Sequence, residues 1–81
     1  MIIRVKLFAV AKELAGSSEV AVEVDDGATL ADVERALVKD VPALADIVSH
    51  ARWAVDAKFA SRTEKILQRS EVALIPPVSG G

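Results

Sequence analysis

The chain has 81 residues, of which 52% are hydrophobic, so we expect one small domain with a modest core. It contains no cysteine, which excludes disulfides, thiolate metal sites and a cysteine nucleophile. Its formal net charge is −2 and its basic residues are scattered, which disfavours nucleic acid or an anionic membrane as a partner. The sequence shows neither the apolar core of a signal peptide nor a membrane-spanning run, and we expect a cytoplasmic protein.

The first segment, IIRVKLF at residues 2–8, alternates in hydrophobicity and predicts a strand with one buried face. Its buried face is formed by Ile3, Val5 and Leu7. Phe8 ends the segment on the outward face. The next segment, AVAKELAG at residues 9–16, predicts a short helix that Gly16 ends as a C-cap.

A second strand is predicted at residues 18–24, SEVAVEV, and the DDG that follows at 25–27 predicts a turn. The inward face of this strand is formed by Val20, Val22 and Val24. Residues 29–41 carry the strongest helical pattern. Thr29 can cap the start, and Asp32 three residues later completes a weaker form of the capping box. The apolar face of this helix consists of Leu30, Val33, Leu37 and Val41.

Pro42 ends the long helix, and residues 42–51 predict a short second helix or a turn. Two more strands are predicted, RWAVDA at 52–57 and EVALI at 71–75. The first two strands of the chain are joined too briefly for a crossover, so we expect them to pair antiparallel. This order of elements predicts an α+β fold in which the long helix packs across one face of the sheet.

Two large apolar side chains are placed outward by the alternation, Phe8 after the first strand and Ile75 at the end of the last. If these strands are neighbours, the two residues form an apolar patch beside the C-terminal tail, and such patches can mark partner surfaces. The alternative is that loops cover them, or that they are ordinary scattered surface residues. The residues by themselves favour that alternative slightly.

Autonomous catalysis is not indicated by any motif in the chain. His50 is the only histidine, and without a second histidine or a cysteine it makes a poor metal site. The Asp25–Asp26 pair belongs to a DDG turn. There is no phosphate-binding glycine loop, no Ser–His–Asp set and no HExxH motif, so we expect no metal site.

The remaining feature is the C-terminal segment PPVSGG. Pro76 and Pro77 stop the last strand and favour an extended exit. Gly80 and Gly81 carry no side chains, so their backbone can pass where a β-carbon would clash. The terminal carboxylate is ionised at neutral pH and is a poor electrophile until it is activated, for instance as an acyl-adenylate. The alternative is a disordered end with chance glycines.

Taken together, the segments described above resemble those of the small sulfur-carrier subunits of molybdopterin synthase, which are ubiquitin-like β-grasp proteins. The resemblance covers nearly the whole chain and is carried by IIRVKLFA, KELAG, TLADVERAL, WAVD and, above all, EVALIPPVSGG. It implies a mixed sheet of four to five strands, with residues 1–75 as the β-grasp domain and 76–81 as an extended diglycine tail. Two segments depart from the family: Asp56 stands where Asn is frequent, and QRSEV stands where DGDEV is frequent.

The resemblance also implies a mechanism. A ubiquitin-activating-like adenylyltransferase, which consumes ATP, would adenylate Gly81, and a sulfurtransferase would then replace AMP to leave a thiocarboxylate. The tail would enter the large subunit of molybdopterin synthase and donate sulfur to cyclic pyranopterin monophosphate, forming the molybdopterin dithiolene. Two charged carriers would be consumed per product, in a heterotetramer. The chain would not be an enzyme on its own and would hold no cofactor stably.

Specific roles follow from the same resemblance. Gly81 would carry the sulfur covalently, and Gly80 would permit passage through a narrow channel. The residues expected to contact partners are Phe8, Ile75, Pro76, Pro77, Val78 and Ser79. Alternative functions are a sulfur carrier for thiamine synthesis or tRNA thiolation, a ubiquitin-like modifier of target lysines, and a binding module with an inert tail.

Overall fold

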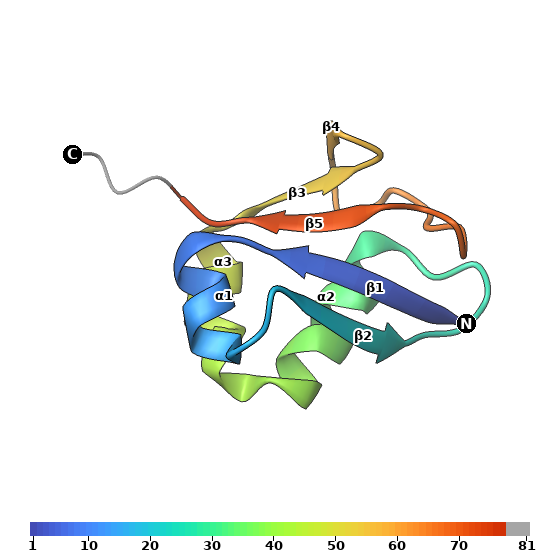
Figure 1. The fold of residues 1–81 in the computed structure, drawn as a ribbon. Helices are drawn as coiled ribbons and strands as arrows, with labels where there is room; N and C mark the ends of the chain where they lie inside the picture. Colours follow the sequence, from blue (N-terminus) through green and yellow to red (C-terminus); the bar gives the residue numbers. More distant parts are fainter. Residues whose placement is uncertain (78–81) are drawn as a thin grey trace.

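The computed structural model describes residues 1–77, which form a five-stranded mixed sheet with helices on one face (Figure 1). The strands are β1 Ile2–Leu7, β2 Glu19–Glu23, β3 Arg52–Val55, β4 Lys58–Ala60 and β5 Val72–Ile75. The helices are α1 Ala9–Ala15, α2 Leu30–Asp40, the 3₁₀-helix Pro42–Leu44 and α3 Ala45–His50. The predicted α+β class, with its long helix across one face, is confirmed.

The sheet has the order β2-β1-β5-β3-β4. β1 and β2 pair antiparallel, as predicted, whereas β1 and β5 pair parallel. β3 pairs antiparallel with both β5 and β4. The first and last strands of the chain are therefore neighbours in the middle of the sheet, and β5 is paired on both sides up to Leu74, with Ile75 paired to β3 alone.

The core lies between the sheet and the helices, and the predicted alternation places its side chains. Ile3, Val5 and Leu7 of β1 are buried, and so are Val72 and Leu74 of β5. The facing residues of α2 are Leu30, Val33 and Leu37. Trp53 of β3 is 1% exposed and packs in the same core. Because the helices cover only this face, the opposite face of the sheet is open (Figure 1).

Local signals place the ends of both predicted helices. Gly16 ends α1 with a left-handed backbone, at φ 71°. At the start of α2, the Asp32 carboxylate accepts hydrogen bonds from the Thr29 backbone N–H (2.9 Å) and hydroxyl (3.2 Å). Pro42 ends the helical run, and the short helix expected after it is α3.

The strand β4 is not among the strands that the alternation predicts. It is three residues long, and the turn before it, Asp56–Ala57, lacks the Asn-Gly or Asp-Gly signature of a two-residue hairpin. Both turn residues nevertheless have positive φ, 50° and 67°. Pairing with β3 in the assembled sheet, rather than local sequence preference, accounts for this hairpin.

The segment between β4 and β5 is irregular but attached to the domain. Ile66 is buried, and its backbone N–H bonds the carbonyl of Ala28 at 2.9 Å. Backbone N–H groups at the start of α2 bond carbonyls of this segment, from Leu30 to Glu64 (2.9 Å) and from Ala31 to Arg62 (3.0 Å). These bonds use N–H groups that a helix start leaves without intrahelical partners. No helix in the described part of the chain is long and apolar enough to cross a membrane.

Candidate functional site

Phe8 and Ile75 lie side by side on the open face of the sheet. The parallel register pairs Leu7 with Leu74, so the next residues of both strands adjoin and point away from the core. Phe8 is 48% exposed and Ile75 is partly exposed. No loop of the described chain buries them, and both line one groove. The condition for an apolar patch, that their strands be neighbours, is met.

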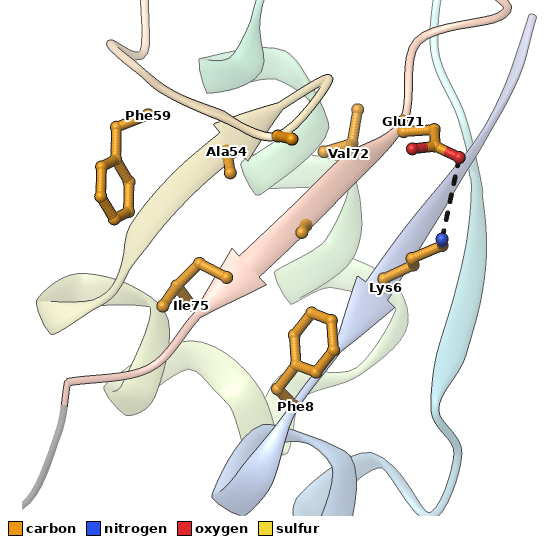
Figure 2. Close-up of a pocket in the computed structure, with 9 residues that line it drawn as sticks. Lys6, Phe8, Ala54, Phe59, Glu71, Val72 and Ile75 are labelled. Atoms are coloured by element: carbon orange, nitrogen blue, oxygen red, sulfur yellow. Dashed lines mark ion pairs between the residues drawn. The ribbon is translucent and has the colours of Figure 1, made fainter.

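The groove is shaped by small residues at its centre. The register aligns Lys6, Ala73, Ala54 and Phe59 in one row across β1, β5, β3 and β4. The two alanines form a low floor, and Phe59 rises beyond them with 60% of its surface exposed. Figure 2 shows Ile75 between the rings of Phe8 and Phe59. The result is an apolar depression of about 330 Å³.

One end of the groove is polar. Lys6 Nζ lies 3.8 Å from Glu71 Oε1 (Figure 2). The Glu71 backbone N–H also donates to the Asp56 carboxylate at 2.9 Å, and the Asp56 N–H donates to the Glu71 carbonyl at 2.8 Å. The two segments that depart from the family pattern, Asp56 and QRSEV, are therefore bonded to each other. Ala57, the next residue of the hairpin turn, lines the groove.

The other end of the groove is where the chain leaves the sheet. β5 ends at Ile75, Pro76 is partly buried and Pro77 is exposed. The last residues of the predicted tail, Val78, Ser79, Gly80 and Gly81, lie outside the described residues. The structure thus places the root of the tail beside Phe8 and Ile75, and the roles predicted for the tail remain predictions.

The other titratable candidates form no site. His50 is the exposed last residue of α3, and Asp26 with Gly27 forms the predicted turn. Within residues 1–77, no three His, Cys, Asp or Glu side chains are grouped so as to hold a metal ion. The pKa of Asp32 is lowered by the hydrogen bond from the Thr29 backbone, its hydroxyl and the nearby Arg35. That shift belongs to a helix cap.

Phe59 is the groove residue that sequence reasoning missed. It lies on β4, the strand that the alternation did not predict, so neither its face nor its neighbours could be assigned. A weak signal exists in the sequence. The segment KFA follows RWAV after only two residues, Asp56 and Ala57, and a strand there would place Phe59 on the outward face. Recognising the hairpin at Asp56–Ala57 would have placed Phe59 opposite Ala54.

Comparisons with known proteins agree with this architecture. The ThiS family matches residues 5–81. The molybdopterin synthase sulfur carrier subunit of Arabidopsis thaliana is 33% identical over 79 residues, which cover 98% of this chain and 82% of that protein. Small archaeal modifier protein 1 of Haloferax volcanii is 39% identical over 84 residues, covering 94% and 97%. The crystal structure of SAMP1 from Haloferax volcanii covers 100% of both chains with a TM-score of 0.90 and 37% identity, and the ubiquitin-like β-grasp fold is thereby confirmed.

Proposed function

Because this chain belongs to the ThiS family, we propose that it is the sulfur carrier subunit of a molybdopterin synthase. Full-length similarity to a plant carrier subunit of that enzyme supports the proposal. In this role residues 1–75 form a rigid β-grasp domain and residues 76–81 form the tail that carries sulfur. The chain supplies the reacting group and the docking surface, and the catalytic residues belong to its partners.

The observation that carries this proposal is the apolar groove at the root of the tail. β5 pairs with β1 on one side and with β3 on the other, so the chain leaves the sheet at a fixed point, directly after Ile75 and beside Phe8. A partner that covers the groove therefore receives the tail at a defined place and direction. We propose that this partner is the large subunit of the synthase, with Phe8, Phe59 and Ile75 buried at the contact.

The reacting group is the terminal carboxylate of Gly81. An activating enzyme of the ubiquitin-activating type joins this carboxylate to the AMP portion of ATP and releases pyrophosphate. A sulfurtransferase then delivers sulfur to the glycyl carbon, AMP leaves, and a thiocarboxylate remains. In the large subunit the sulfur passes to cyclic pyranopterin monophosphate. Water then cleaves the bond between the glycyl carbon and the transferred sulfur, which returns the tail to a carboxylate for another cycle. Two sulfurs complete the dithiolene.

In this proposal the tail residues allow the terminal glycine to enter a channel in the partner. Gly80 passes a channel too narrow for a β-carbon, while Val78 and Ser79 line that channel. Pro76 and Pro77 hold the exit extended, so less conformational freedom is lost when the tail enters the partner. No stable cofactor is needed on this chain, because ATP is consumed by the activating partner.

Intact mass measurement tests the proposal directly. Protein isolated from its native cells is expected to contain a fraction heavier by the difference between sulfur and oxygen, located on the terminal glycine. A chain lacking Gly81 is expected to fold normally but to abolish molybdenum-cofactor synthesis. Cofactor synthesis that survives the deletion would refute the carrier function.

A second function, covalent modification of proteins, is favoured by the similarity to small archaeal modifier protein 1. The same activated carboxylate would then form an isopeptide bond to a target lysine. Adducts of Gly81 on other proteins would support this modifier role, and a thiocarboxylate without adducts would support the carrier. Loss of thiamine or of thiolated tRNA after the deletion, with the molybdenum cofactor intact, would identify a different sulfur acceptor.

A further inference from the structure

Arg52 stands beside the docking groove at the end where the tail leaves. It is exposed on β3, and the sheet register pairs it with Ile75 of β5. Two residues further along β3, Ala54 pairs with Phe59 of β4, which makes Arg52 and Phe59 diagonal neighbours on the open face. The guanidinium carbon of Arg52 lies 3.6 Å from the centre of the Phe59 ring. Arg52 therefore contacts one wall of the groove and adjoins the root of the tail.

The stacked geometry holds a fixed positive charge at this point. A guanidinium stays protonated at all physiological pH values, and it is weakly hydrated enough to lie flat on an aromatic ring. Stacking leaves the N–H donors at the edge of its plane available to a partner. The Phe59 ring thus supports Arg52 in place at the surface.

The charge of Arg52 is not compensated within the described chain. The ion pairs formed by residues 1–77 use other cations, namely the N-terminus, Arg4, Lys6, Arg35 and Arg62. Lys6 at the opposite end of the groove is paired with Glu71. The docking face is therefore electrostatically asymmetric: Lys6 and Glu71 are paired at one end and leave the Asp56 carboxylate there, whereas Arg52 places a positive charge at the tail end.

We propose that Arg52 is a specificity residue of the docking surface, and that the large synthase subunit places a carboxylate against it. The inference rests on the function proposed above and adds the chemistry of the contact. The partner surface has an apolar side chain over the alanine floor and an Asp or Glu beside the tail entrance. Arg52 disfavours look-alike partners that present a cation at this point, because like charges at a desolvated rim repel each other.

Affinity measurements with the purified large subunit from the same organism test the inference. Arg52→Gln is expected to weaken binding about fivefold at about 0.1 M salt, within the range for a partly exposed ion pair. Most of this effect is expected to vanish at about 1 M salt, where the Debye length falls to about 3 Å. Arg52→Lys, which keeps the charge, is expected to retain most of the affinity.

Lys39→Gln is the matched control, since it removes the same charge from α2 on the opposite side of the sheet. It is expected to leave affinity unchanged, and thermal unfolding establishes that each variant is folded. If Arg52→Gln binds as tightly as the unaltered chain, Arg52 merely covers Phe59 and the inference is wrong, while the proposed function stands. If the unaltered chain does not bind the large subunit at all, both proposals fail.

Discussion

At the scale of single residues, Ala57 shows strain next to the groove. It occupies the left-handed region at φ 67°, which costs a residue with a β-carbon about 1–2 kcal/mol. Glycine avoids that cost but loses about 0.5–1 kcal/mol more backbone entropy on folding. Ala57→Gly is therefore expected to stabilise the domain by about 0.5–1 kcal/mol, measured by urea denaturation.

Ala54→Gly is the control for this substitution, because Ala54 lies within β3, where glycine is unfavourable. It is expected to destabilise the domain. A loss of stability in Ala57→Gly as well would contradict the strain assigned to the turn and would show that the Ala57 methyl group contributes to packing.

Phe8 is exposed enough that its contribution to partner binding can be measured apart from its contribution to folding. Because 48% of its surface is exposed, Phe8→Asp is expected to change the free energy of unfolding by roughly 0.5 kcal/mol or less. Its affinity for the large subunit is expected to fall by about 30-fold, equivalent to about 2 kcal/mol for an aromatic anchor. Calorimetric titration and thermal unfolding measure the two effects separately.

Leu67 supplies a matched control for Phe8. It is 62% exposed and lies on the segment between β4 and β5, outside the groove lining. Leu67→Asp is expected to leave affinity unchanged. Equal losses of affinity in the two variants would show that the groove is not the docking surface, and unfolding of Phe8→Asp would show that Phe8 belongs to the core.

At the scale of elements, the start of α2 is stabilised by a charge. The Thr29 backbone N–H is the main cause of the lowered pKa of Asp32, with the Thr29 hydroxyl and Arg35 also contributing. Since the folded-state pKa lies below the unfolded value of about 3.9, the unfolded chain binds the proton first on acidification. The contribution of Asp32 is therefore complete above about pH 4 and is lost as pH falls through the folded-state pKa.

Asp32→Asn is expected to be less stable than the unaltered chain at neutral pH, with a difference that shrinks below about pH 4. Urea midpoints measured from pH 7 to pH 2 provide the comparison. A difference that stays constant over this range would mean that the ionised carboxylate contributes nothing beyond the shape of the side chain.

At the scale of the whole molecule, Glu34 connects helix, sheet and the segment after β4. Its Oε1 accepts hydrogen bonds from Trp53 Nε1 at 2.9 Å and from Arg62 Nε at 2.8 Å. Glu34→Ala leaves the indole N–H of the buried Trp53 without this partner and is expected to cost about 1–3 kcal/mol. The fluorescence of Trp53, the only tryptophan, reports the unfolding midpoint.

Arg62→Ala is the informative comparison, because it removes one bond to Glu34 but leaves the bond from Trp53. It is expected to cost less than Glu34→Ala. Equal costs in the two variants would indicate that anchoring of the segment by Arg62, and not satisfaction of the Trp53 N–H, accounts for the stability.

The sequence by itself determined the features that depend on local period and local chemistry. Alternation placed Ile3, Val5 and Leu7 inward, because successive strand residues point to opposite faces. The positions of Gly16, Thr29 and the Pro42 break set the helix ends, because capping and proline act within a few residues. The PPVSGG segment predicted an extended exit and a terminus free of side chains, because proline and glycine act on the backbone at their own positions.

Only the tertiary structure decided which outward residues meet. Alternation assigns a face to Phe8 and Ile75 but not the parallel pairing of β1 with β5, which joins segments from opposite ends of the chain. Phe59 lies in the same groove because β4 pairs with β3 through a hairpin, and the turn residues of that hairpin, Asp56 and Ala57, lack the usual turn sequence. The stacking of Arg52 on Phe59 depends on that same pairing. Long-range register, which no short window of sequence encodes, is the physical reason that the groove emerged only with the fold.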